Sequence, residues 1–85
     1  MREKVRSRQY IMTLHAEEEM NDEDLSIFDV EHCILTGTIV ERQRDAMTAE
    51  WKYRIAGTSF DGTHAEVIAK LSITDKLVII TVYLS

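Results

Sequence analysis

The chain has 85 residues, of which 45% are hydrophobic and 29% are charged, and its net charge is −5. A chain of this length holds one core, and because it buries only about 60% of its unfolded surface, dimerisation stays open as an alternative. The negative charge argues against a nonspecific nucleic-acid binder, although a local basic patch still attracts phosphate. No segment reaches membrane-spanning length, so insertion into a membrane is not expected.

Cys33 is the single cysteine of the chain. One cysteine excludes an internal disulfide and a thiolate-only metal cluster, and it fits a reducing compartment. We therefore expect a cytoplasmic protein in which Cys33 is a small buried residue.

The first 37 residues are predicted to form the helical half of the domain. Residues 2–9 are polar and basic, and a short first helix is expected there. The capping candidates Thr13 and Ser26 and the spacing of apolar residues predict further helices over 14–21 and 27–36. The last of these is expected to end at Gly37 as a C′ residue. Between the first two helices, the apolar residues Tyr10 to Met12 predict an extended segment.

After Gly37 the apolar period changes to two residues, which is typical of strands. Strands are expected at 38–43, 51–56, 65–71 and 77–84. The prediction is thus an α+β domain over 1–85, in which two to three helices in 1–37 pack on one face of a roughly four-stranded antiparallel sheet in 38–85.

Two loops set the predicted strand register. Phe60 to Gly62 suits a three-residue hairpin loop with Gly62 left-handed, and Thr74-Asp75 suits a two-residue turn. Residues opposed across a ladder share a face of the sheet. The first loop then pairs Ile55 with Val67, Tyr53 with Ala69 and Trp51 with Leu71 on the apolar face. On the same face the second turn pairs Leu71 with Val78, Ala69 with Ile80 and Val67 with Val82.

The opposite face is the predicted site. There Lys52 opposes Lys70, Arg54 opposes Ile68 and Glu66 opposes Tyr83, with Ile79 and Thr81 between them. Like charges directly opposed cost stability unless solvent screens them or an anion lies between them. Lys52, Arg54 and Lys70, with Thr81 and Tyr83, therefore predict a phosphate-binding patch. The alternative is an ordinary solvated face on which Glu66 neutralises its neighbours.

The last strand, 77–84, is apolar on both faces and should not be an open edge. Either Tyr10 to Met12 flank it, or a partner protein covers it.

His15 lies just after a predicted helix start, where an imidazole can act as a general acid or base or simply stabilise the helix end. His15 and Glu19 have the i,i+4 spacing of a metal pair, but no third ligand is evident. No metal site and no cofactor are expected.

Five short segments carry a resemblance to a known family: Thr13 to Ala16, Met20, Gly37 to Glu41, Trp51 to Tyr53 and Ile79 to Tyr83. With these segments the chain resembles the bacterial domain of unknown function family 4258, over nearly its whole length. That family is similar to compact ribonuclease toxins of the RelE and MqsR kind, and its members are found beside zinc-finger antitoxins.

The resemblance implies a toxin that cleaves RNA without a metal ion, with an antitoxin protein as its partner. Matching positions are His15, Thr81 and Tyr83, which the resemblance implies as catalytic. Where many members have arginines, this chain has Glu19 and Glu23, which favours the alternative of a non-catalytic interaction module. Such a module would meet its partner, a second copy of the chain included, through the last strand or the acidic helix.

Overall fold

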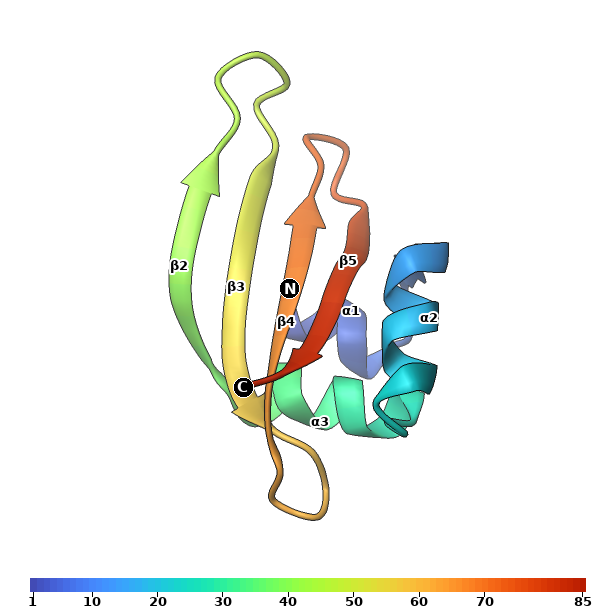
Figure 1. The fold of residues 1–85 in the computed structure, drawn as a ribbon. Coiled ribbons are helices and arrows are strands. Elements are labelled where there is room, and N and C mark those ends of the chain that lie inside the picture. Colours follow the sequence, from blue (N-terminus) through green and yellow to red (C-terminus); the bar gives the residue numbers. More distant parts are fainter.

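The computed structural model describes all 85 residues and has an α+β fold, as predicted (Figure 1). The elements are α1 (Arg2–Arg6), β1 (Tyr10–Met12), α2 (Leu14–Asp22), α3 (Ile27–Thr36), β2 (Thr38–Arg44), β3 (Trp51–Thr58), β4 (His64–Leu71) and β5 (Leu77–Leu84). The five strands form one sheet in the order β1-β5-β4-β3-β2. Strands β2 to β5 are the predicted antiparallel meander, and β1 adds a parallel strand beside β5.

The predicted caps start the two longer helices. The Thr13 hydroxyl accepts a hydrogen bond from the Ala16 N–H at 3.1 Å, and Ser26 forms a reciprocal capping box with Asp29. The first helix, α1, is shorter than the expected 2–9, because it ends at Arg6 and Arg8 takes a left-handed conformation (φ 57°). None of the helices is both long and apolar enough to cross a membrane.

The core lies between the sheet and the helices behind it in Figure 1. Helix α3 packs against β3 and β4, α1 packs against α3, and α2 lies beside β5. The largest fully buried side chains come from α1, α3 and the central strands: Val5, Val30, Cys33, Ile34, Ile55, Val67, Leu77, Ile79 and Val82. The face of the sheet opposite α3 has no helix over it, so the fold leaves this face open to solvent.

The register between β3 and β4 is as predicted. Ile55 pairs with Val67 and Lys52 with Lys70, and the loop between the strands has three residues with Gly62 left-handed (φ 89°). The Ser59 N–H donates to the Thr63 carbonyl at 2.9 Å, which closes the loop.

The register between β4 and β5 differs from the prediction. The connecting loop has three residues rather than two, because the Ser72 N–H bonds the Lys76 carbonyl and Asp75 is left-handed (φ 66°). Leu71 therefore pairs with Leu77 and Ala69 with Ile79, so the predicted pairs of Leu71 with Val78 and Ala69 with Ile80 are wrong. A one-residue shift exchanges the two faces of a strand.

A β-bulge next to Ile80 restores the predicted register further along β5. The shift falls between the pairs of Ile68 and Ala69, and Val67 again opposes Val82. Ile79, expected on the open face, is instead fully buried in the core. Ile80 takes its place and borders a hollow on the open face.

The outer edge of β5 is covered by the chain itself. Strand β1 pairs with its first half, with Met12 opposite Ile79. Beyond that point α2 and its N-cap Thr13 cover the edge of β5. The Thr13 hydroxyl donates to the Ile80 carbonyl and the Val82 N–H donates to the Glu19 carboxylate, both at 3.2 Å. Of the two alternatives for this strand, flanking by residues 10–12 is thus confirmed. The edge strands of the sheet are β1 and β2.

Candidate functional site

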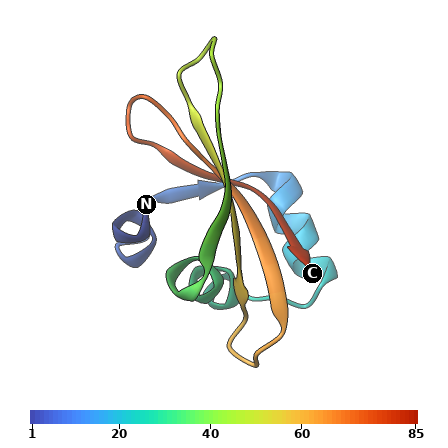
Figure 2. The same cartoon turned by 90° about the vertical axis from the view of Figure 1, so that its left-hand side faces the viewer.

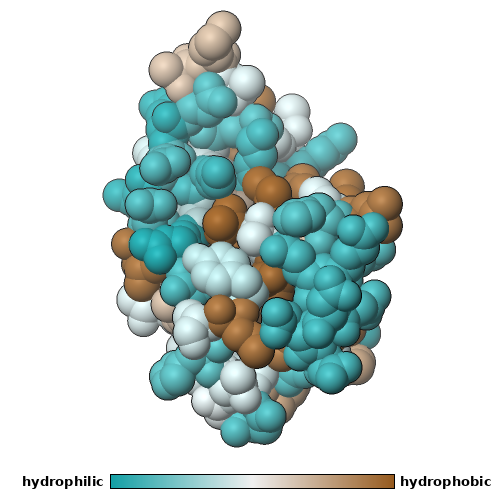
Figure 3. Space-filling view, in the orientation of Figure 1, coloured by the Kyte–Doolittle hydropathy of each residue, from teal (hydrophilic) through white to brown (hydrophobic).

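The open face of the sheet carries the sequence-predicted cations. Figure 3 views this side of the molecule, where hydrophilic side chains alternate with apolar ones. The β3–β4 register places Lys52 and Arg54 beside Lys70, and the β4–β5 register brings Thr81 opposite Ile68. Lys52 is exposed, and the others are partly buried.

Arg54, Glu66 and Tyr83 form a hydrogen-bonded cluster across three strands. Glu66 Oε1 accepts from Arg54 Nη1 and from the Tyr83 hydroxyl, each at 2.8 Å. Glu66 and Tyr83 are directly opposed on β4 and β5, and Arg54 reaches them from β3. The Glu66 side chain is 16% exposed, so solvent reaches the cluster only in part. We call these three residues the Glu66 cluster.

The hydrogen bonds of the Glu66 cluster favour the protonation states that its three groups ordinarily have at neutral pH. Donation by Tyr83, and then by Arg54, lowers the pKa of Glu66. The same bond to Glu66 raises the pKa of Tyr83, and the Glu66 carboxylate raises the pKa of Arg54. At neutral pH the cluster therefore holds an ionised carboxylate, a protonated phenol and a guanidinium. An ionised carboxylate can accept a proton, and the phenol can donate one.

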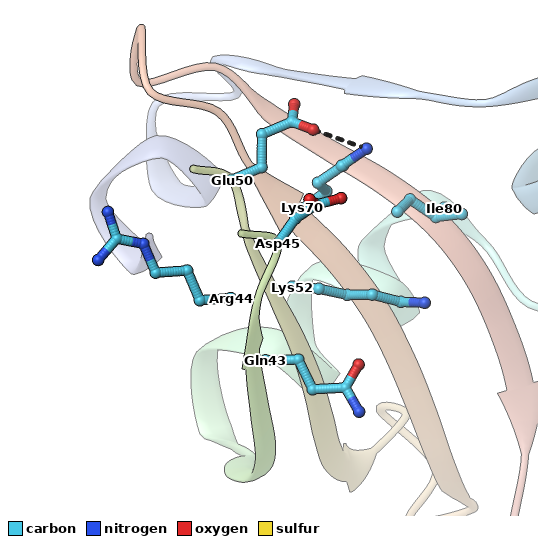
Figure 4. A pocket seen from close by; sticks show the side chains of 7 residues that line it. All are labelled: Gln43, Arg44, Asp45, Glu50, Lys52, Lys70 and Ile80. Atoms are coloured by element: carbon cyan, nitrogen blue, oxygen red, sulfur yellow. Dashed lines mark ion pairs between the residues drawn. The ribbon is translucent and has the colours of Figure 1, made fainter. Parts of the chain in front are cut away.

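Lys52 and Lys70 border a hollow of about 310 Å³ near the ends of the β2–β3 and β4–β5 hairpins (Figure 4). Lys70 forms an ion pair with Glu50 at 2.9 Å, and this hydrogen bond raises the pKa of Lys70. Glu50 thus compensates the opposed lysines that the sequence predicted. Lys52 forms no ion pair.

Lys52 also borders a second hollow, of about 190 Å³, on the side of the Glu66 cluster. Arg54, Glu41 and Ile68 line this hollow with it. Arg54 Nε lies 3.9 Å from Glu41, so this guanidinium faces two carboxylates. Of the three predicted cations, Lys52 alone keeps its charge unpaired, and it lies between the two hollows.

His15 lies apart from these cations. It is exposed in the first turn of α2, and its Nε2 is 3.2 Å from Glu19 Oε1, the same oxygen that accepts the Val82 N–H. None of the hollows that Lys52 borders includes His15. No group of three or more His, Cys, Asp or Glu side chains has the arrangement of a metal site.

Cys33 has a packing role, as expected. It is buried beneath the sheet, and its thiol lies 3.4 Å from the Ala65 carbonyl, to which it donates. Burial raises the pKa of the thiol to about 11, so the thiolate form is suppressed at neutral pH.

Two features of the site were missed by sequence reasoning. Glu66 was treated only as a neutralising charge, although its predicted position opposite Tyr83 already pointed to a shared hydrogen bond. The predicted pairing places Trp51 and Tyr53 on the apolar face, yet both are only partly buried. Alternation assigns a residue to a face of the sheet, but it does not say whether a helix covers that part of the face.

Comparisons with known proteins give one match. No curated protein and no solved structure matches the chain. The model of a family described as a domain of unknown function, DUF4258, matches residues 12–84, which include all the segments that carried the resemblance. The chain belongs to the DUF4258 family.

Proposed function

We propose that this domain binds RNA on the open face of its sheet and cleaves it without a metal ion. The observation that carries the proposal is the Glu66 cluster, in which one carboxylate oxygen is held at 2.8 Å from both Arg54 and Tyr83. It lies beside Lys52, which has no carboxylate partner. A positioned carboxylate, cations and a proton donor are the groups that metal-independent RNA cleavage requires.

The chemistry assigned to these groups is an internal transfer at the phosphate. The Glu66 carboxylate takes the proton of a ribose 2′-hydroxyl, and the 2′-oxygen forms a bond to the neighbouring phosphorus. The bond from phosphorus to the 5′-oxygen breaks, and that oxygen takes a proton from Tyr83, leaving a 2′,3′-cyclic phosphate and a 5′-hydroxyl. Lys52 and Arg54 stabilise the negative charge that grows on the phosphate oxygens.

The remaining predicted residues have supporting roles in this proposal. Lys70 attracts the RNA backbone while its charge is shared with Glu50. Thr81, on the same face, positions the ribose. His15 is an alternative proton donor, which requires the RNA to reach the outer edge of β5. In the cell, the resemblance to RelE-like toxins suggests that an antitoxin protein restrains the activity.

RNA cleavage by the purified protein in excess chelator tests the proposal. We expect products that end in 2′,3′-cyclic phosphate, and a loss of at least about a hundredfold in rate for Glu66→Gln, because a general base contributes about 10²–10⁴ in rate. Lys52→Met should lose activity, whereas the matched control Lys76→Met, an exposed lysine in the β4–β5 turn, should keep it. Intact RNA, or full activity of Glu66→Gln, would contradict the proposal.

The second candidate is a non-catalytic interaction module that forms a homodimer. Its specific support is β2, an edge strand in which all seven residues are exposed, including the apolar Ile39 and Val40. A small domain gains stability by pairing such an edge with a second copy of itself. The outer edge of β5 is not available for this, and a charge at the buried Ile79 would disrupt the core rather than test an interface.

The oligomeric state distinguishes the two candidates. For a β2-mediated homodimer, light scattering should give twice the monomer mass for the wild type and the monomer mass for Val40→Lys. Lys52→Ala and Tyr83→Ala should leave the dimer unchanged. A wild type that is monomeric at all concentrations removes this candidate.

A further inference from the structure

Four side chains on the helix side of the β2–β3 hairpin form a surface that has no role in the proposed cleavage. Arg44 is opposite Trp51 and Arg42 is opposite Tyr53 in the β2–β3 ladder. The rings of Trp51 and Tyr53 are stacked, with their centroids 6.4 Å apart and their planes at 27°. The guanidinium carbons of Arg42 and Arg44 lie 5.5 and 5.6 Å from the centre of the Trp51 ring. We call these four residues the Trp51 platform.

The platform lies where the sheet extends past the helices. In Figure 1 the far end of the β2–β3 hairpin continues above α1 and α3, and Figure 2 shows it diverging from the β4–β5 hairpin. Trp51 and Tyr53 are therefore only partly buried, and both arginines are exposed. Arg42 and Tyr53 line a hollow here together with Met1, Arg2 and Glu3 of the N-terminal segment.

The arginines of the platform keep their charge free. Of the ten lysines and arginines, five form ion pairs with carboxylates: Lys4, Arg6, Arg8, Arg54 and Lys70. Three of the other five, Arg42, Arg44 and Lys52, lie on this one hairpin. In a chain with a net charge of −5, the cations without carboxylate partners are thus concentrated at one place.

Arg44 connects the platform to the site on the open face. It lines the hollow that Lys52 and Lys70 border, and in Figure 4 its side chain points away from those lysines. On the other side of the sheet the same guanidinium lies over Trp51. Since β2 is an edge strand, an extended ligand can pass around this edge from one face to the other.

We propose that the Trp51 platform stacks the unpaired bases of single-stranded RNA whose phosphates lie at Lys52. Aromatic rings and guanidinium planes both stack on nucleobases, and they do so with little preference for sequence because every base has a flat π face. The carboxylates of a negatively charged peptide would form ion pairs with the arginines, but they would not stack on the rings of Trp51 and Tyr53. The inference rests on the proposed function for the identity of the ligand, and it adds where the bases lie.

Trp51 is the single tryptophan of the chain, so its fluorescence reports on the platform alone. The probe is a 2′-O-methyl oligouridylate of twelve nucleotides, which cannot be cleaved because it lacks the attacking hydroxyl. We expect saturable quenching of Trp51 emission by this oligonucleotide and none by an abasic oligomer of the same length and charge.

Variants assign the binding to the platform. Tyr53→Leu should weaken binding of a labelled oligonucleotide, followed by fluorescence anisotropy, by roughly fivefold to a hundredfold, as expected for the loss of one stacked base. Arg42→Gln and Arg44→Gln should weaken it as well, and the matched control Arg6→Gln, at an exposed position of α1, should not. Circular dichroism confirms that each variant is folded.

The outcomes separate this inference from the proposed function. Quenching by the oligonucleotide without any RNA cleavage supports the platform and removes the enzyme. Binding seen by anisotropy with unchanged Trp51 emission, or equal binding of the abasic oligomer, overturns the platform, whether or not the protein cleaves RNA.

Discussion

Gly57 lies against the backbone of α3 at Cys33, and replacing it with alanine should destabilise the fold. A Cβ atom there would lie 2.5 Å from the Cys33 carbonyl oxygen and 3.1 Å from both Cys33 Sγ and Gly37 Cα. The nearest atom belongs to the backbone, so no side-chain rotation relieves the contact. Helix α3 must shift as a unit, and overpacking of this kind costs about 1–3 kcal/mol or more. Since a backbone has to move, we expect Gly57→Ala to fall at the upper end, about 3 kcal/mol.

Urea unfolding followed by Trp51 fluorescence measures this loss. With a denaturant slope of about 1 kcal/mol per molar for a small domain, the midpoint should fall by about 3 M. Cys33→Ala should not rescue the variant, because the oxygen in the way is part of the backbone. Gly62→Ala is the control: its φ is 89° but the space around it is empty, so only backbone strain of about 1 kcal/mol is expected. A Gly57→Ala loss below about 0.5 kcal/mol would refute the reasoning.

Two further predictions concern hydrogen bonds outside the sheet ladder. Glu19→Ala should leave the Val82 N–H without its acceptor and cost about 1–2 kcal/mol, with faster hydrogen exchange at Val82, whereas Glu19→Gln keeps an acceptor and should restore most of the stability. Unchanged exchange at Val82 would contradict this. Hydrogen bonds from Ser59 and Thr63 lower the pKa of Asp61 from 3.8 to about 2. A lowered folded-state pKa gives stability that is present above the unfolded value and is lost as the pH falls through the folded one. The thermal midpoint of Asp61→Asn should therefore fall less than that of the wild type between pH 4 and pH 2, and parallel curves would exclude this role.

The strand register could be predicted wherever a glycine marked the loop. Gly62 supplies the left-handed residue that a three-residue hairpin needs, and the whole β3–β4 ladder followed from it. In the next loop the left-handed position is taken by Asp75, which also suits a tight two-residue turn, so the loop length was misjudged. The bulge next to Ile80 has no glycine or other local sequence signal, because it lies in a run of β-branched residues from Val78 to Val82.

The sequence predicted the cations of the candidate site, but it did not predict their ion-pair and hydrogen-bond partners. Alternation placed Lys52, Arg54 and Lys70 on one face, and the structure agrees. Which of them is neutralised depends on the reach of side chains from other strands and loops. Glu50, for example, lies outside any strand and still bonds Lys70. Lys52 therefore stands out only once the fold is known.

The pairing of β1 with β5 has a consequence for how the chain folds during synthesis. The contact between Thr13 and Ile80 joins residues 67 positions apart. Neither β1 nor α2 has a strand to pack against until β5 has emerged from the ribosome, whereas α3 and the β2–β3 hairpin meet partners much earlier. Closing so long a loop is slow, because its entropy is lost before the contacts form. The outer edge of β5 therefore stays exposed until β1 and α2 have docked on it. An exposed strand edge makes a folding chain prone to aggregation.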